Sequence, residues 1–286
     1  MMRVTFIGFG EAGAAFAREG DLAYDVKTGL PEQAAAKQHD YDRAGVTGCA
    51  TAAQALNGAG VILCVVTADQ ALRAAEEGAA HLAPGALWLD GNSVAPDTKR
   101  AAAAAIEAAG GRYVDVAVMA PVHPAKKAVP LLISGPHAGA GGAALRAMGF
   151  AHVADAGGKV GDASAIKMIR SVMVKGMEAL SAECVIAAYR AGVGDAVLAS
   201  LDASWKMQSW ADRADYNLDR MLVHGLRRAA EMEEAAKTLE GLGVVPAMTR
   251  GTIVRQRALG TLDLAPPDGL AAKLAAIVEQ GKERAE

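Results

Sequence analysis

Short apolar runs of strand length alternate with alanine-rich segments of helical periodicity along the first half of the chain. The predicted strands cover residues 3–7, 22–25, 61–66, 86–90, 112–118 and 131–134, and the predicted helices cover 11–19, 32–38, 70–81 and 97–109. The run at 61–66 is apolar throughout, as in a parallel strand that is covered on both faces. This alternation is typical of α/β proteins, so we predict a Rossmann-type, doubly wound sheet in residues 1–157.

The pattern changes after residues 157 and 158, which are both glycine, and we expect no strand beyond them. A helix-compatible stretch covers 162–191, which at 1.5 Å per residue makes a helix of about 45 Å. Further helical segments are predicted at 194–206, 217–242 and 246–259. We therefore expect residues 158–286 to form an all-α domain built on a long interdomain helix. A second copy of the chain is expected to complete its core, which predicts a homodimer.

A glycine-rich turn joins the first predicted strand to the first predicted helix. It consists of Gly8, Phe9, Gly10, Glu11, Ala12 and Gly13, the pattern G-x-G-x-x-G. In a dinucleotide site the first glycine permits the tight turn, the second lets the backbone approach the pyrophosphate, and the third lets the helix pack closely. Its position between a strand and a helix predicts dinucleotide binding.

Asp25 ends the second predicted strand, 17 residues after Gly8. A carboxylate there accepts hydrogen bonds from the adenosine ribose hydroxyls, which favours NAD over NADP. Lys27 and Thr28 follow directly and offer an alternative, since they suit a 2′-phosphate. NAD is therefore expected, with NADP kept open.

The next two predicted strands lead into turns that could contact a ligand. Val66 and Thr67 close one strand, and Asn92 and Ser93 follow the other. Ligands of open α/β sheets bind at the carboxyl ends of strands, so these residues are predicted to border the cofactor. The alternative is that Asn92 and Ser93 are ordinary turn residues, with Asp97 capping the following helix.

Composition and charge narrow the range of partners. The formal net charge is -3 and the chain has no basic tract, so we expect neither nucleic acid nor an anionic membrane as a partner. No apolar run reaches the length of about 18 residues needed to span a membrane. The first strand begins too early for a signal peptide, which predicts a cytoplasmic protein. The histidines lack metal-ligand spacing, so no metal is expected.

Candidate substrate residues lie mostly in the second half. Helical spacing places Lys167, Arg170 and Ser171 on one face of the long helix, which either lines a cleft or is a solvated surface. His224 and Arg227 either reach an anionic substrate or, for the arginine, pair with acidic residues one turn away. His123, in a proline-rich loop, is a second candidate for a titrating group.

Together these motifs resemble the β-hydroxyacid dehydrogenase superfamily, which includes the 3-hydroxyisobutyrate, tartronate-semialdehyde and 6-phosphogluconate dehydrogenases. The glycine fingerprint, the cofactor turn at 65–67 and a stretch at 92–96 similar to S-T-x-x-P follow one another as in that family. Residues 158–167 resemble its G-x-x-G-x-x-x-x-x-K segment. The resemblance covers nearly the whole chain and implies that Lys167 is the catalytic lysine.

Three departures mark a less characterised branch with a divergent C-terminal domain. The family's D-A-P-V-S-G-G loop aligns with residues 115–121, so its substrate-binding serine is replaced by Met119. Its asparagine, four residues after the lysine, is Ser171 here. The K-D-L helix segment is replaced near residues 227–229. These departures leave open a larger or a non-carboxylate substrate, and Met119 predicts a more apolar wall of the site.

The expected function is hydride transfer between NAD(P) and a small alcohol/carbonyl pair, with a β-hydroxy acid or a related hydroxy compound favoured. In that reading Lys167 acts as general acid and base. Met119, His123, Arg170, Ser171 and either His224 or Arg227 orient the substrate. Two alternatives stay open: a 6-phosphogluconate-type oxidative decarboxylase, and a non-catalytic protein that senses the dinucleotide.

Overall fold

The computed structural model describes residues 3–190, 192–204, 209–243 and 245–283. The chain divides into two compact units, Met1–Met168 and Ile169–Glu286. The division falls inside helix α7 (Asp162–Arg190), so the two units share this helix. Each unit is described separately below.

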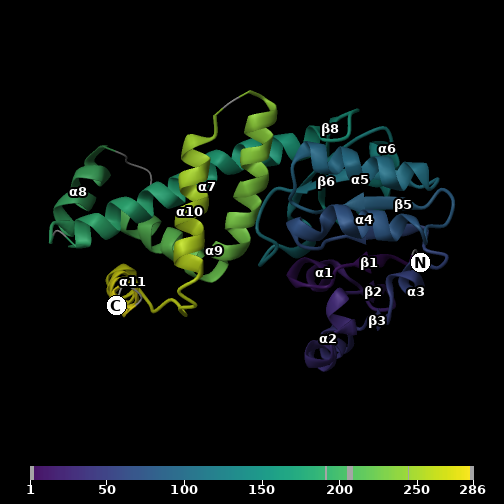
Figure 1. The fold of residues 1–286 in the computed structure, drawn as a ribbon, viewed down its shortest axis with the longest axis horizontal. Coiled ribbons are helices and arrows are strands. Elements are labelled where there is room, and N and C mark those ends of the chain that lie inside the picture. Colours follow the sequence, from purple (N-terminus) through teal and green to yellow (C-terminus); the bar gives the residue numbers. More distant parts are fainter. Residues whose placement is uncertain (1–2, 191, 205–208, 244, 284–286) are drawn as a thin grey trace. The chain divides into compact units, whose positions relative to one another are not determined.

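The first unit is built on one eight-stranded sheet (Figure 1). Its strands are β1 (Thr5–Ile7), β2 (Leu22–Tyr24), β3 (Thr47–Gly48), β4 (Val61–Cys64), β5 (Leu87–Asp90), β6 (Arg112–Val118), β7 (Pro130–Ser134) and β8 (His152–Gly157). Their order across the sheet is β3-β2-β1-β4-β5-β6-β7-β8, and every pairing is parallel except β6 with β7. The predicted Rossmann-type sheet is confirmed.

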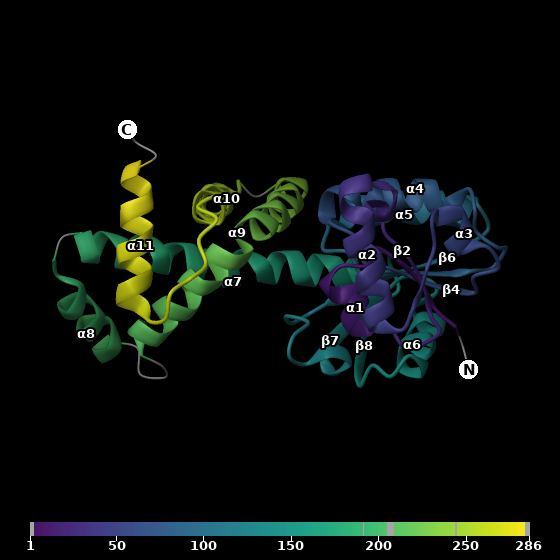
Figure 2. The ribbon, with the colours of Figure 1, turned by 90° about the horizontal axis from the view of Figure 1, so that it is seen from below.

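Helices cover both faces of the sheet. They are α1 (Glu11–Phe16), α2 (Pro31–Ala44), α3 (Ala52–Leu56), α4 (Ala71–Ala79), α5 (Pro96–Ala108) and α6 (Ala138–Ala147), with 3-10 turns at Val26–Gly29, Ala68–Gln70 and Lys126–Ala128. One apolar cluster contains Phe16 of α1 and Leu145 of α6, and the other contains Ala75 of α4 and Ile106 of α5. Figure 2 shows α4 and α5 on the face opposite α6. Burial of both faces explains the continuous apolar run in β4.

Four short elements were not predicted: β3, α3, α6 and β8. Strand β8 lies at the edge of the sheet, paired with β7 alone, and most of its residues are at least partly exposed. Its sequence therefore has no apolar run to mark it. Helix α6 has three glycines, which are poor helix formers, but Gly141 packs against Val114 and Gly142 against Ile133 of the sheet. Tertiary packing thus outweighs local propensity here.

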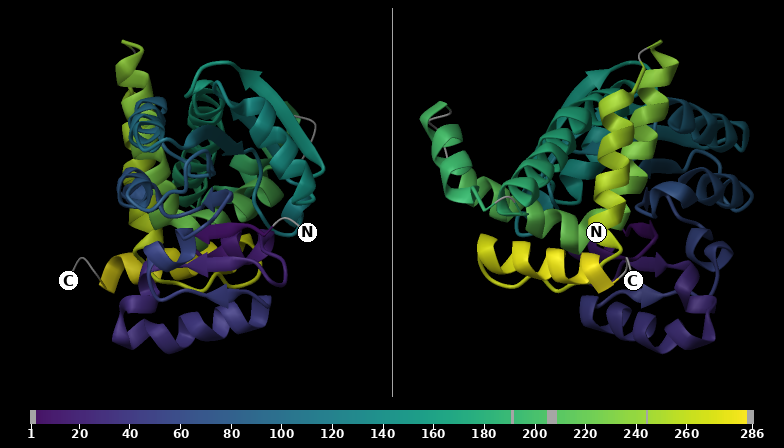
Figure 3. Two further views of the ribbon diagram at one scale, coloured as in Figure 1. Left: turned by 90° about the vertical axis from the view of Figure 1, so that its right-hand side faces the viewer. Right: turned by 60° about the vertical axis from the view of Figure 1, so that its left-hand side comes forward.

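The second unit is all helical in its described residues, as predicted (Figure 3). Besides the rest of α7 it contains α8 (Gly194–Ser204), α9 (Trp210–Gly241), α10 (Ala247–Gly260) and α11 (Leu270–Glu283). Helix α8 was predicted to end at Lys206, which lies outside the described residues. Helix α11 was not predicted. Leu274 and Ile277 of α11 join the unit's apolar core with Leu218 of α9.

Helices α9 and α10 lie side by side and cross at two glycines (Figure 1). A Cβ atom on Gly225 would lie 2.3 Å from the carbonyl oxygen of Gln256. A Cβ atom on Gly260 would lie 2.5 Å from the backbone nitrogen of Leu226. Both distances are far below van der Waals contact, so the two backbones approach this closely because neither residue has a side chain.

Candidate functional site

The glycine-rich turn has the conformation expected of a dinucleotide loop. Gly8 has a φ of 88°, and a Cβ atom on it would lie 2.6 Å from the carbonyl oxygen of Val65. A Cβ atom on Gly13 would lie 2.8 Å from the carbonyl oxygen of Gly8. By contrast, a Cβ atom on Gly10 would have no neighbour within 4 Å. The fold therefore accounts for Gly8 and Gly13, whereas Gly10 faces open space that suits a bound group.

Phe9, between the first two glycines, is held on three sides. Its backbone N–H donates to Asp25 Oδ2 at 2.8 Å, and its carbonyl oxygen accepts from Lys37 Nζ at 2.8 Å. Its ring centroid is 5.1 Å from that of Tyr41. Sequence reasoning missed Lys37, which is buried although it lies on the polar helix α2. These contacts make the loop a preformed structure.

Asp25 lies at the end of β2, where the ribose contact was predicted. Its Oδ1 accepts from the backbone N–H of Lys27 at 3.0 Å, so each carboxylate oxygen is oriented by one backbone donor. Lys27 itself is exposed. The Thr28 hydroxyl lies 2.8 Å from the hydroxyl of Tyr41, and burial raises the pKa of Tyr41 to about 12. Of the two residues considered for a 2′-phosphate, only Lys27 projects into solvent.

The end of β4 borders the glycine-rich turn, and the end of β5 borders the end of β4. Val66 lies beside Gly8, and the exposed Thr67 starts the turn before α4. Asn92 points inward: its Nδ2 donates to Asp90 Oδ1 at 2.7 Å and to Cys64 Sγ at 3.3 Å. Its Oδ1 has no hydrogen-bond partner among the residues that the structure describes. The Asn92 side chain thus lies inside the turn and stabilises it through these hydrogen bonds.

The sequence left open that Asp97 caps the helix after this turn, but the helix begins in another way. Helix α5 starts at Pro96, its N-cap is Ala95, and no side chain caps it. Asp97 pairs instead with Arg100 on the helix surface. Proline tolerates this position because the first N–H groups of a helix have no partner within the helix. Asp97 is therefore not the N-cap.

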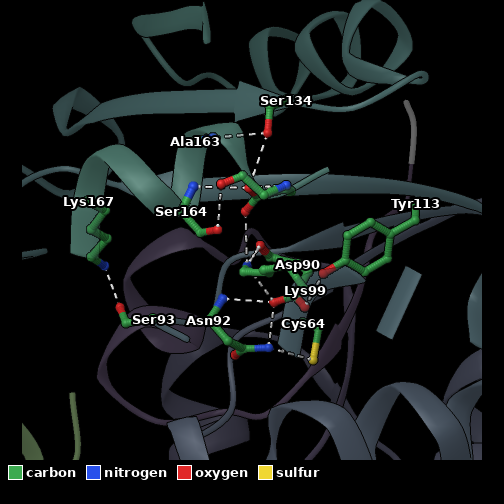
Figure 4. A network of polar contacts seen from close by, with 12 residues as sticks. Cys64, Asp90, Asn92, Ser93, Lys99, Tyr113, Ser134, Ala163, Ser164 and Lys167 are labelled. Atoms are coloured by element: carbon green, nitrogen blue, oxygen red, sulfur yellow. Dashed lines mark hydrogen bonds and ion pairs between the residues drawn. The ribbon is translucent and has the colours of Figure 1, made fainter. Parts of the chain in front are cut away.

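Lys167 and Ser93 meet in the first unit, although 74 residues separate them in the chain (Figure 4). The Lys167 Nζ, on α7, donates a hydrogen bond to the Oγ of Ser93, in the turn after β5. Both side chains are half-buried. The residue that resembles the family's catalytic lysine therefore lies at the carboxyl end of the sheet, where cofactors bind in open α/β folds.

A fully buried polar network lies beneath this pair (Figure 4). Lys99 Nζ, from α5, lies 3.0 Å from Asp90 Oδ1 and 3.3 Å from Asp115 Oδ1, and Tyr113 donates to Asp90 Oδ2 at 2.6 Å. Burial acts to lower the pKa of Lys99, but its two carboxylate partners outweigh burial and hold that pKa above its usual value. Sequence reasoning missed Lys99 because a lysine on an alanine-rich helix resembles a surface residue.

The remaining candidates of the first unit lie on the connection between β6 and β7. Met119 is half-buried, and its backbone N–H donates to the carbonyl oxygen of Pro130 at 2.9 Å. His123 is exposed. The predicted contact of these two residues with substrate stays a prediction.

In the second unit, Ser171 is buried and its Oγ accepts from Lys175 Nζ at 3.3 Å. Lys175 also pairs with Glu231 at 2.8 Å, and Arg227 pairs with the same carboxylate one helical turn away. The helix-surface pairing considered for Arg227 is therefore present. Arg170 is exposed.

The buried arginine of this unit is Arg228, which sequence reasoning did not single out. It pairs with Glu178 of α7, and Gln256 of α10 donates to the same carboxylate at 3.3 Å. Burial lowers the pKa of Arg228. His224, half-buried, lines a hollow of about 410 Å³ together with Tyr216, Asp219, Arg220, Val223, Pro266, Pro267, Asp268 and Lys273. The charge pattern of α9 predicted pairs on the surface of that helix, but not this buried pair with α7.

Comparison with known families identifies the first unit. The family model for the NAD binding domain of 6-phosphogluconate dehydrogenase matches residues 3–154. The chain belongs to this family. The expectations of an NAD(P) cofactor and of membership in the β-hydroxyacid dehydrogenase group are confirmed. Residues 188–259 match a different family, a domain of unknown function, DUF1932, which agrees with the divergent C-terminal domain.

Solved structures resemble the chain over nearly its whole length. A conserved hypothetical protein of Sinorhizobium meliloti 1021 is 36% identical with a TM-score of 0.73, covering 98% of this chain and 97% of that one. The protein MTH1747, described as structurally similar to 3-hydroxyacid dehydrogenases, is 28% identical with a TM-score of 0.65, covering 90% and 99%. Mycobacterium tuberculosis 3-hydroxyisobutyrate dehydrogenase is 16% identical with a TM-score of 0.72, covering 99% of both chains. This last likeness shows the fold alone.

The residues that the structure describes contain no helix that is long and apolar enough to cross a membrane. Within the same residues, no group of three or more histidine, cysteine, aspartate or glutamate side chains has an arrangement that would hold a metal ion.

Proposed function

We propose that this protein is an NAD(P)-dependent oxidoreductase that transfers hydride between the nicotinamide and a small alcohol/carbonyl pair, with a β-hydroxy acid or a related hydroxy compound as substrate. The observation that carries the proposal is the contact of Lys167 with Ser93 at the carboxyl end of a dinucleotide-binding sheet. This contact supports the proposal, because cofactors bind at the carboxyl edge of the sheet in open α/β folds and an amine at that edge can exchange a proton with a substrate.

The bound cofactor supplies the hydride acceptor or donor, and the side chains supply orientation and proton transfer. During oxidation the neutral Lys167 Nζ takes the proton of the substrate hydroxyl, and during reduction its ammonium form returns a proton to the carbonyl oxygen. The Ser93 hydroxyl holds the Nζ in place. Gly10 leaves room for the pyrophosphate, and Asp25 binds the adenosine ribose, which favours NAD.

Six residues are proposed to contact substrate: Met119, His123, Arg170, Ser171, His224 and Arg227. Met119 supports a more apolar wall than the serine of related enzymes would provide. Arg227 and Ser171 already have partners in Glu231 and Lys175, so a substrate anion there would have to compete with the carboxylate. Arg170 is exposed and is the preferred anion contact.

Cofactor titration with Gly10→Ala tests the dinucleotide site. Because a Cβ atom on Gly10 meets nothing within 4 Å, this variant should keep the melting temperature of the wild type. Its dissociation constant for NADH should nevertheless rise about tenfold or more, equivalent to about 1.4 kcal/mol, since the new methyl group occupies the pyrophosphate position. Tryptophan fluorescence quenching measures binding, and thermal unfolding measures stability.

Gly139→Ala is the matched control, because Gly139 on α6 also has open space around its Cβ position. It should change neither NADH binding nor stability beyond a small gain in helix propensity. Equal NADH affinity of Gly10→Ala and wild type would place the cofactor elsewhere. Tighter binding of NADPH than of NADH would move the recognition of the ribose from Asp25 to Lys27. Reduction of NAD by a panel of hydroxy acids then identifies the substrate.

We also propose that the protein forms a homodimer through the helical unit. The support is a row of exposed apolar side chains on α7, where Ile169, Met173 and Leu180 are 46%, 66% and 50% exposed. Their spacing places them along one side of the helix. Light scattering after size-exclusion chromatography should give the mass of two chains, and Met173→Glu should shift it toward one. A monomeric wild type at micromolar concentration would contradict the proposal.

A further inference from the structure

The carboxylate of Asp115 is buried at the start of α7. Its Oδ2 accepts from the backbone N–H of Gly161 at 3.2 Å, from that of Ser164 at 3.0 Å and from the Ser134 hydroxyl at 3.1 Å. The Ser134 Oγ in turn accepts from the backbone N–H of Ala163 at 3.0 Å. Side chains of the adjacent strands β6 and β7 therefore accept hydrogen bonds from three backbone N–H groups at the start of α7, which would otherwise lack partners.

The same carboxylate is tied to the turn after β5. Lys99 Nζ contacts Asp115 Oδ1 at 3.3 Å, donates to the carbonyl oxygen of Asp90 at 2.6 Å and contacts Asp90 Oδ1 at 3.0 Å. Asp90 Oδ1 also accepts from the backbone N–H of Asn92 at 2.9 Å, the residue that precedes Ser93. One fully buried ammonium thus joins the carboxylate at the start of α7 to the carboxylate that shapes the turn (Figure 4).

These contacts and the hydrogen bond between Lys167 and Ser93 form a closed loop of interactions, which we call the circuit. Lys167 lies in the second turn of α7, whose first turn is held by Asp115, and Ser93 lies in the turn held by Asp90. We propose that Asp115, Lys99 and Asp90 are positioning residues that set the contact of Lys167 Nζ with Ser93 Oγ. The inference rests on the proposed function, because the placement of Lys167 has catalytic meaning only if Lys167 transfers protons.

The charges explain why the circuit is stable in a buried site. One ammonium faces two carboxylates, and the excess negative charge lies on the side of Asp115, at the start of a helix of 29 residues. The unsatisfied N–H groups there carry partial positive charge, which offsets the second carboxylate. Removal of Lys99 would leave two buried carboxylates without their shared cation, and removal of Asp115 would leave N–H groups at the start of α7 without an acceptor, so either change disturbs the neighbouring contacts.

Chemical labelling tests the inference without any substrate. In Asp115→Ala the start of α7 loses two of its three acceptor contacts, those of Gly161 and Ser164, so Lys167 Nζ is released from Ser93. Labelling by acetic anhydride, followed by mass spectrometry, should be several-fold faster at Lys167 relative to the exposed Lys159 of the same chain. Asp115→Asn keeps an oxygen for the two backbone donors and should restore most of the wild-type ratio. Ser134→Ala should give a smaller increase.

Thr5→Val is the structural control. Thr5 is buried and donates to the carbonyl oxygen of Ala55 at 3.1 Å, within the same unit but outside the circuit. It should lower stability and leave the labelling ratio of Lys167 to Lys159 unchanged. An unchanged ratio in folded Asp115→Ala would overturn the inference. If Asp115→Ala does not fold, an unchanged ratio in Ser134→Ala overturns it instead.

Kinetics separate this inference from the proposed function. With a substrate found by screening, Asp115→Ala should lower kcat about tenfold to a hundredfold while the dissociation constant for NADH stays within twofold of wild type, because misplacement of a reacting group by about 1 Å has effects of this size. Loss of activity in Lys167→Ala but not in Asp115→Ala would overturn the positioning role alone. Full activity in Lys167→Ala would contradict the proposed function. The labelling ratio would still test, without any substrate, whether Asp115 sets the contact of Lys167 with Ser93.

Discussion

Lys167→Ala should lower kcat with a hydroxy-acid substrate by about two to four orders of magnitude. The alanine side chain cannot take the hydroxyl proton as hydride leaves, and no other lysine contacts Ser93 among the described residues. The dissociation constant for NADH should change little, because the residues proposed to bind the dinucleotide lie in the glycine loop and at the ends of β2, β4 and β5. Initial rates of NAD reduction and NADH titrations measure the two effects.

Lys159→Ala is the matched control for this variant. Lys159 precedes α7 by three residues and its side chain is exposed, so its removal should leave kcat within about twofold of wild type. A loss of equal size in both variants would show a general effect of charge. If Lys167→Ala retains the rate of the wild type, and that rate is slow, the protein is better explained as a dinucleotide sensor without catalysis.

Gly225→Ala should lower the free energy of unfolding by about 1–3 kcal/mol or more. The new Cβ atom would lie 2.3 Å from the backbone oxygen of Gln256 and 2.8 Å from the backbone of Gly260. Backbone atoms of a helix cannot move aside as a flexible side chain can, so α9 and α10 must separate along their crossing. Separation also exposes the apolar residues around Leu222 and Leu259. Urea denaturation monitored by circular dichroism measures the loss.

The contrasting variant is Gly251→Ala, on the exposed side of α10. A Cβ atom on Gly251 would have no neighbour within 4 Å, so the substitution should raise the free energy of unfolding by up to about 1 kcal/mol through helix propensity. Equal effects of Gly225→Ala and Gly251→Ala would contradict the close crossing of α9 and α10.

Much of the first unit follows from short stretches of sequence. The glycine turn is largely local, because the positive φ of Gly8 and the close approach of Gly13 to Gly8 arise within the fingerprint. Only the contact of Gly8 with Val65 comes from a distant segment, the end of β4. Strand β6 was predicted with its observed bounds, because Tyr113 and three valines lie between two glycines and a proline-rich loop. Helix α2 is longer than predicted, since its second half is polar except for the buried Tyr41.

The site beneath Lys167 was decided by contacts between distant segments. Lys99, Asp90 and Asp115 come from α5, β5 and β6. The residues next to each of them in the chain do not indicate a buried ion pair. Only the parallel pairing of β5 with β6, which sets Asp90 beside Asp115, makes a shared partner for Lys99 possible. Local sequence carries no record of that pairing, because desolvation and ion pairing depend on what surrounds a group in space.

The same reason explains the helical unit. Its charge pattern predicted pairs between helix turns, and Arg227 with Glu231 is such a pair. The burial of Arg228 against Glu178 depends instead on the packing of α9 against α7. Periodicity along a chain thus reveals elements and the loops that join them. Which polar side chains become buried partners is decided when the elements pack, since only then does each lose its water.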